Sequence, residues 1–110
     1  MTPRRGEVWL FDLGMNAKTR PVLVVSVAYG DEDRAIVTVV PHTTDMRNSP
    51  FEVVIPALFL RPGAFLVQGV STYPKVWGIR KLGTIKPGQM ETVMSALASW
   101  LGIDRHENVQ

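Results

Sequence analysis

An arginine and a threonine stand at the ends of two runs of β-forming residues. Arg20 opens the run RPVLVVS over 20–26, and Thr43 closes the run VTVVPHTT over 37–44. Pro21 favours extended backbone at Arg20, and the planar guanidinium can bind a phosphate through two parallel hydrogen bonds. A threonine hydroxyl can donate to another phosphate oxygen. The pair therefore suggests phosphate chemistry, although a solvated arginine beside a turn would show the same spacing.

The residues around Thr43 leave its role open. Pro41 is expected to end the strand ladder, and either Thr43 or Thr44 could donate to a phosphate or satisfy backbone groups at the start of a loop. His42 is the only titratable base in the central region, and its ordinary pKa of about 6.5 suits a general acid or base. If the strand continues through His42, however, its side chain points away from Thr43. A packing or surface histidine is therefore the preferred interpretation.

Other side chains could contact a nucleic acid. Ser26 and Gln68 could orient a phosphate or meet a base edge, although such residues more often cap a strand. Trp77 lies near Tyr73 and is the better stacking candidate, whereas Trp100 falls in a helical stripe and is expected in a core or interface. Five cations could steer a polyanion, with a scatter that is equally that of a solvated surface: Lys18, Arg47, Lys75, Arg80 and Lys81.

Composition limits the classes of protein. A chain of 110 residues that is 45% hydrophobic fits one domain over 1–110, with a core over about 5–102 and a frayed tail over 103–110. The net charge of +2 permits nucleic-acid binding without requiring it. Cysteine is absent and there are two histidines, so a thiolate or histidine-rich metal site is excluded and no metal or cofactor is expected.

The chain shows no pattern expected of a membrane or secreted protein. Glu7 and Asp12 interrupt the first apolar run before it reaches the length of a signal-peptide core. The stretch VVIPALFL over 53–60 is far shorter than the ~20 residues of a membrane span. A soluble cytoplasmic protein is expected.

Short β-forming runs are followed by one helix. The runs cover 6–12, 20–27, 34–41, 51–55, 64–70 and 81–85, which predicts a small antiparallel sheet or barrel. Residues 22–25 are apolar on both faces and predict a central strand. In the first run one face is expected to join the core and the other to pack against a neighbour. Apolar residues recur at helical spacing from Met90 to Leu101, with Pro87 suited to the first turn and Gly102 to the stop.

The order of these segments resembles the MazF/PemK toxin endoribonucleases from about Arg5 to Gly102. Besides the two runs named first, the resemblance rests on GEVWLFDLG at 6–14, FEVVIP at 51–56 and GAFLVQGV at 63–70. It implies a mainly β protein with a C-terminal helix, an SH3-like β-barrel of the MazF/PemK/CcdB type. It also implies a homodimer that cleaves single-stranded RNA without a metal, as the toxin of a type II toxin–antitoxin pair with a cognate antitoxin.

The resemblance implies particular site residues. The arginine of the family's R-P-x-L-V-x-S motif contacts the scissile phosphate and matches Arg20, and the first hydroxyl of its P-x-T-[ST] pattern matches Thr43. Both are expected to be catalytic, in a reaction where the ribose 2'-hydroxyl attacks phosphorus and leaves a cyclic phosphate and a 5'-hydroxyl. The residues expected to bind RNA are Lys18, Ser26, Thr44, Arg47 and Gln68.

One departure from the family leaves the proton transfers open. Many members have a longer loop after the first strand with Glu or Gln, whereas here LGMNAKTRP reaches Arg20 without a carboxylate. Arg20, His42 or solvent could then move the protons. Two alternatives to a nuclease are a non-catalytic SH3-like module that binds nucleic acid or protein, and a gyrase-inhibitor-like toxin acting through its C-terminal residues.

Overall fold

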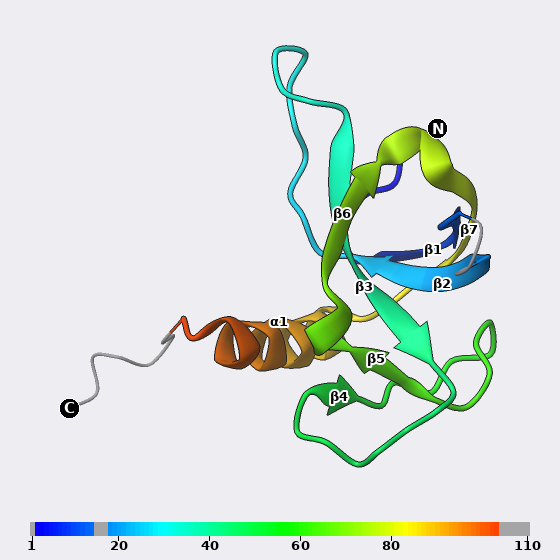
Figure 1. Ribbon diagram of the computed structural model, residues 1–110, viewed down its shortest axis with the longest axis vertical. Coiled ribbons are helices and arrows are strands. Elements are labelled where there is room, and N and C mark those ends of the chain that lie inside the picture. The colour runs from blue at the N-terminus through cyan, green and yellow to red at the C-terminus, as the bar shows by residue number, and fades with distance from the viewer. Residues whose placement is uncertain (1, 15–17, 104–110) are drawn as a thin grey trace.

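The computed structural model describes residues 2–14 and 18–103, which form an antiparallel sheet and one long helix (Figure 1). The strands are β1 (Glu7–Asp12), β2 (Thr19–Val24), β3 (Ile36–Thr43), β4 (Glu52–Val53), β5 (Ala64–Leu66), β6 (Ser71–Pro74) and β7 (Gly78–Thr84). Two short 3-10 helices, η1 (Val67–Gly69) and η2 (Lys75–Trp77), flank β6, and α1 (Pro87–Leu101) follows β7.

The sheet curls into an SH3-like barrel that is not fully closed. Its strand order is β4-β5-β3-β2-β1-β7, and β6 pairs separately with β3. Within the described residues β6 and β7 form no ladder, and η2 carries the chain from one to the other at the upper right of Figure 1, beside the N-terminus. The predicted mainly β fold with a C-terminal helix is confirmed, and so is the central position of β2.

Strand β3 changes partners at Pro41. Its pairing with β2 ends at Val22↔Pro41, and its last two residues pair instead with β5, as His42↔Phe65 and Thr43↔Ala64. The prediction that the strand ends at 41 was therefore wrong by two residues, because β5 supplies a new backbone partner beyond the proline. Strand β6 at 71–74 was not predicted, and the expected strands at 51–55 and 64–70 are shorter in the structure.

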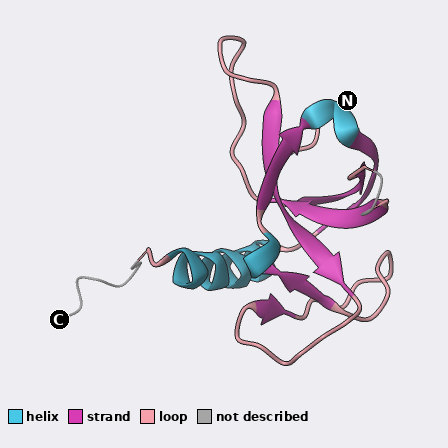
Figure 2. Cartoon of the chain, viewed as in Figure 1, coloured by secondary structure: helices cyan, strands magenta, loops and turns pink. Residues whose placement is uncertain are grey.

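Both faces of the curled sheet are buried, which gives two apolar clusters. We call the cluster beneath α1 the helix core; Val8, Leu23 and Val40 enter it from the sheet. The cluster inside the curled sheet is the barrel core and includes Trp9 and Phe11. Alternate residues of one strand thus serve different cores, because successive side chains point to opposite faces. The first strand was expected to pack its second face against a neighbour, and that neighbour is another part of the same curled sheet (Figure 2).

Helix α1 begins and ends as its sequence predicts. Pro87 occupies its first turn, and the side-chain oxygen of Gln89 accepts the backbone N–H of Lys86 at 2.8 Å. Gly102 adopts the left-handed conformation at φ 75° and ends the helix. Trp100 is 42% exposed, so it does not lie in the core. Its ring packs edge-to-face with that of Phe51, with ring centroids 5.2 Å apart.

The frayed tail expected over 103–110 lies, apart from Ile103, outside the described residues. No helix in the part of the chain that the structure describes is long and apolar enough to cross a membrane.

Candidate active site

Arg20 and Thr43 lie on neighbouring strands at the same rim of the barrel. Arg20 is exposed on β2, opposite Phe11 of β1, and Thr43 is the last residue of β3. The β2–β3 ladder ends at Val22↔Pro41; Arg20 precedes Val22 by two residues and Thr43 follows Pro41 by two, so both lie at the same end of the two strands. Residues two apart share a face of the sheet, so both side chains lie on the face of Val22, which is the barrel-core face. The fold therefore brings the two candidate catalytic residues together.

The two threonines are held differently. Thr43 is partly buried, its backbone pairs with Ala64, and its Oγ1 accepts the backbone N–H of Asp45 at 3.0 Å. That bond uses a lone pair and leaves the hydroxyl hydrogen free to donate. Thr44 is exposed and lies beyond the strand. The fixed position of Thr43 suits a transition-state donor better than the loop position of Thr44.

Gly63 allows β5 to approach Thr43, and sequence reasoning did not identify it. A Cβ built at Gly63 would lie 2.2 Å from the carbonyl oxygen of Thr43 and 2.7 Å from Cε1 of His42. Only a residue without a side chain fits this contact. The signal in the sequence was a glycine immediately before the run AFLV, but glycine is common before strands and does not reveal its contact.

His42 faces away from Arg20 and Thr43. Its side chain is 5% exposed. The imidazole packs edge-to-face with the ring of Phe65, a residue of the helix core, with ring centroids 5.1 Å apart. Burial lowers the pKa of its imidazole below the ordinary 6.5, so the ring is neutral at pH 7. Its Nε2 is buried with no hydrogen-bond partner among the described residues. These features favour the packing interpretation over acid–base catalysis.

Three of the expected RNA-binding residues lie on loops or turns near this rim of the barrel. Lys18 precedes Arg20 by two residues in the β1–β2 turn and adopts φ 58°. Gln68 is exposed in η1, next to Gly69, which packs so closely on Pro41 that an added Cβ would lie 2.7 Å from the proline Cγ.

Arg47 lies on the loop that follows Thr43. The Glu52 carboxylate fixes this loop by accepting the backbone N–H of Arg47 at 2.9 Å and that of Ser49 at 3.1 Å. The Arg47 side chain is exposed, and the loop that carries it has an anchored backbone.

Ser26 is not part of this arrangement. It lies six residues along the chain from Arg20, a separation of about 20 Å in extended backbone. Its Oγ accepts the backbone N–H of Thr38 at 3.0 Å. The structure therefore separates Ser26 from the candidate catalytic pair.

Two further residues that could contact a nucleic acid, Lys81 and Trp77, have partners within the protein, and so does Trp9. Lys81 forms an ion pair with Glu7 at 3.2 Å. Trp77 is 39% exposed and stacks on Tyr73 with ring centroids 5.2 Å apart, so Tyr73 already covers one of its faces. Trp9 is buried in the barrel core and donates from Nε1 to Glu7 at 2.9 Å. In the described residues no group of three or more His, Cys, Asp or Glu side chains is placed to hold a metal ion.

Solved structures of toxins share this fold. An endoribonuclease in complex with its cognate antitoxin from Mycobacterial species is 31% identical, with a TM-score of 0.80 over 93% of this chain and 97% of that one. A second endoribonuclease from Mycobacterial species is 29% identical, with a TM-score of 0.78 over 94% of each chain. The MazE–MazF structure (Form-II) from Deinococcus radiodurans, at 23% identity and a TM-score of 0.80 over 94% of this chain and 99% of that one, supports the fold alone.

The sequence profile of one family matches nearly the whole chain. That family is described as the PemK-like, MazF-like toxin of type II toxin–antitoxin systems, and the match covers residues 4–101. It confirms the resemblance inferred from the motifs around Arg20 and Thr43. The chain therefore belongs to the PemK-like, MazF-like toxin family of type II toxin–antitoxin systems.

Proposed function

We propose that this toxin is an endoribonuclease that cleaves single-stranded RNA at the rim where Arg20 and Thr43 meet. Family membership and the 31% identical endoribonuclease support the reaction class. The observation that supports the site is the β2–β3 ladder, whose last pair, Val22↔Pro41, lies two residues from Arg20 on one strand and two residues from Thr43 on the other; the Thr43 hydroxyl is anchored by the backbone N–H of Asp45. Two donors on rigid strands suit a reaction that builds negative charge on phosphorus.

The proposed reaction is an internal transfer at phosphorus. The ribose 2'-oxygen attacks the adjacent phosphorus, the bond to the 5'-oxygen breaks, and the products are a cyclic phosphate and a 5'-hydroxyl. Arg20 neutralises the charge that develops on the phosphoryl oxygens through two parallel hydrogen bonds, and Thr43 donates a third. Preorganised donors of this kind are often the largest catalytic contribution, and removing one costs about 10²–10³ in rate.

We propose that solvent carries out the proton transfers in this scheme. His42 faces the helix core and is neutral at pH 7, and a guanidinium keeps its protons in proteins. We therefore assign Arg20 an electrostatic role. Water accepts the 2'-proton and supplies the proton that the 5'-oxygen gains. The short β1–β2 loop, which lacks a carboxylate in its sequence, is consistent with solvent in this role.

We propose a cognate antitoxin, a second copy of the chain and cytoplasmic RNA as partners. A relative's structure contains its cognate antitoxin. The dimer is supported by an exposed apolar group at the end of α1, where Trp100 is 42%, Leu101 53% and Ile103 58% exposed. Residues of this kind, placed side by side, are typical of an interface.

The test compares the protein with its Arg20→Ala and Thr43→Ala variants on end-labelled RNA in excess EDTA. We expect discrete cuts with 5'-hydroxyl ends and a loss of about a hundredfold or more in each variant. Thr92→Ala, at an exposed position of α1, is the matched control and should cleave within a few-fold of the parent protein. Cleavage that survives Arg20→Ala would remove this residue from the mechanism. RNA bound but never cut would favour the non-catalytic module, and inhibition of gyrase would favour the third alternative.

A further inference from the structure

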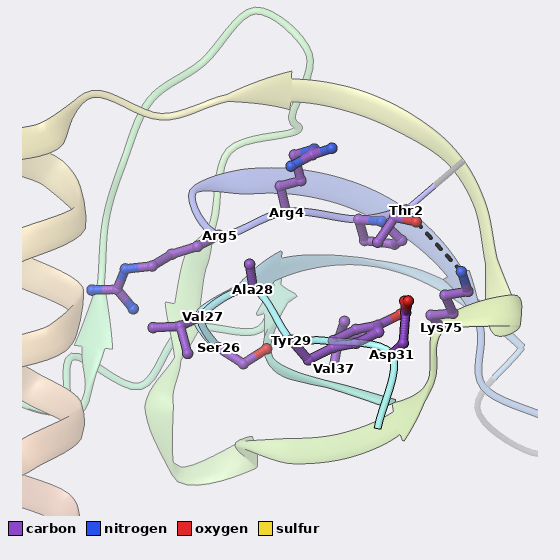
Figure 3. A pocket seen from close by; sticks show the side chains of 11 residues that line it. Thr2, Arg4, Arg5, Ser26, Val27, Ala28, Tyr29, Asp31, Val37 and Lys75 are labelled. Atoms are coloured by element: carbon purple, nitrogen blue, oxygen red, sulfur yellow. Dashed lines mark hydrogen bonds between the residues drawn. The ribbon is translucent and has the colours of Figure 1, made fainter. Parts of the chain in front are cut away.

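A second concave site lies at the opposite end of β2 from Arg20 (Figure 3). We call it the N-terminal pocket, because residues 2–5 form one wall; the segment 26–31 and Lys75 form the others. Its volume is about 520 Å³, within the range of pockets that hold small ligands. Nothing in the reaction proposed above uses this pocket.

Positive charge dominates the walls of the N-terminal pocket. The lining includes Arg4, Arg5, Lys75 and one carboxylate, that of Asp31, so it carries a net charge of +2, three cations less one anion; in Figure 3 the Arg4 and Arg5 side chains point away from Asp31. In the described part of the chain none of these four side chains forms an ion pair. Lys75 Nζ donates to the hydroxyl of Thr2 at 3.4 Å. A ligand phosphate would therefore meet a lining of net positive charge whose cations form no ion pair within the described residues.

The two arginines play different parts. The Arg5 guanidinium donates to the carbonyl oxygen of Val25 and contacts Met94 Sδ at 3.8 Å, and in Figure 3 it extends toward α1. Arg4 is exposed, and its side chain has no such anchor among the described residues. Arg4 and Lys75 are consequently the cations available to a ligand.

Glu7 fixes the backbone that carries Arg4. Its Oε1 accepts the backbone N–H of Arg4 at 2.9 Å, and its own backbone N–H donates to the Arg4 carbonyl at 3.0 Å. Burial raises the pKa of the Glu7 carboxyl, but hydrogen bonds from Trp9 and Arg4 and the ion pair with Lys81 outweigh it and hold the pKa low. The carboxylate thus stays ionised and the turn stays closed at neutral pH. Arg4 is presented from a preorganised turn.

An aromatic ring forms part of the lining. Tyr29 packs against the barrel core, which includes Val37, and both residues border the pocket. The hydroxyl of Tyr29 is buried with no partner among the described residues. Asp31, two residues further along the chain, is exposed and could accept hydrogen bonds from the N–H groups of a base edge. The pocket thus combines a ring for stacking, an acceptor for base N–H groups and cations for phosphate.

We propose that the N-terminal pocket binds one nucleotide of the RNA strand, away from the scissile bond. A nucleotide supplies an aromatic base, N–H donors and a phosphate, which match Tyr29, Asp31 and the Arg4–Lys75 pair. An acidic peptide would use the same cations but would supply no nucleobase to stack on the ring. The inference rests on the proposed ribonuclease function, since it names a further contact for the same substrate.

Because the N-terminal pocket lies far from Arg20, its effect on affinity should depend on the length of the RNA. The chain from Arg20 to Ser26, which borders the pocket, spans about 20 Å. An RNA of about three nucleotides occupies the catalytic rim alone, whereas one of about twelve can reach both sites, because stacked nucleotides advance about 3.4 Å each. The pocket should raise affinity for long RNA only.

The experiment measures binding of 2'-O-methyl RNA, which cannot be cleaved, at about three and about twelve nucleotides. The test variant carries Arg4→Gln and Lys75→Gln; the control carries Arg80→Gln and Lys86→Gln and loses the same charge outside the pocket. We expect the test variant to bind the long RNA about tenfold more weakly at ~0.15 M salt, because each phosphate contact contributes about 0.7 to the salt slope. The short RNA should bind equally to both variants.

Three outcomes would refute the proposal that the N-terminal pocket binds a nucleotide of the RNA. Equal weakening by both double variants would mean that only overall charge matters, and weakening of the short RNA would place the two residues at the catalytic rim. An acidic peptide that displaces long RNA from the parent protein but fails to bind the test variant would assign the pocket to a protein partner. Cleavage of unmodified RNA, measured beside these titrations, separates the two proposals: pocket-dependent binding without cleavage would refute only the ribonuclease.

Discussion

Replacing Gly63 by alanine tests how the barrel positions Thr43. The added Cβ would lie 2.2 Å from the Thr43 carbonyl oxygen, against an ordinary contact of 3.4 Å or more, so β5 and β3 must separate by about 1 Å. The obstacle is backbone, which cannot rotate away as a flexible side chain would. Overpacking of this kind costs about 1–3 kcal/mol, and a displacement of about 1 Å at a catalytic group costs about a hundredfold in rate.

The assay separates these two effects. A loss of about 1–3 kcal/mol leaves a domain with about 5–15 kcal/mol of stability folded, so unfolding cannot account for a hundredfold loss of cleavage. We expect urea denaturation to show the destabilisation and RNA cleavage to show the larger kinetic loss. Gly88→Ala is the matched control: a Cβ there meets nothing within 4 Å, and alanine favours the helix by about 1 kcal/mol. Parent-like stability and cleavage in Gly63→Ala would refute the tight contact with Thr43.

Three further predictions concern Arg20, His42 and Glu52. Arg20→Lys keeps the charge but loses the two-pronged donor, so cleavage in the same assay should fall at least about tenfold; a parent-like rate would exclude bidentate binding. The pKa of His42 in the folded protein lies below the unfolded value of about 6.5. As the pH falls through about 6.5, the unfolded chain therefore binds a proton more readily than the folded protein, and the free energy of unfolding should decrease. Urea titrations from pH ~8 to ~5 should show this loss in the parent and a smaller one in His42→Leu, and equal losses would place the acid sensitivity elsewhere. Glu52→Gln weakens the acceptor for two loop N–H groups and should speed amide exchange at Arg47 and Ser49; unchanged exchange would mean that the carboxylate does not anchor the loop.

Local patterns in the sequence predicted the elements that are locally encoded. The helical spacing from Met90 to Leu101 and the glycine at 102 predicted α1, because side chains at that period share one face and glycine adopts the left-handed conformation without strain. The apolar run over 22–25 predicted a central strand, since only a strand buried on both faces favours such a run. The motifs with Arg20 and Thr43 indicated the family, which the profile match over 4–101 confirmed.

Strand β6 and the last residues of β3 could not be predicted in the same way. Thr72 of β6 pairs with Thr38 of β3, a partner 34 positions away, and their hydroxyls lie 2.8 Å apart. Neither residue signals that partner locally. The strand continues past Pro41 for the same reason, because β5 supplies backbone partners that the proline's own neighbourhood does not reveal.

The sequence by itself determined which side chains are available: an arginine before a proline, a threonine after a β-run, and no cysteine for a thiolate site. Tertiary structure decided how they are arranged. The pairing of β2 with β3, and of β3 with β5 beyond Pro41, places Arg20 and Thr43 at the same rim, turns His42 toward Phe65 of the helix core, and separates Ser26 from both. It also builds the N-terminal pocket from residues 2–5, 26–31 and 75. Register is fixed by hydrogen bonds and packing between segments distant in the chain, so a shift of one residue would reverse every facing side chain without any change in sequence.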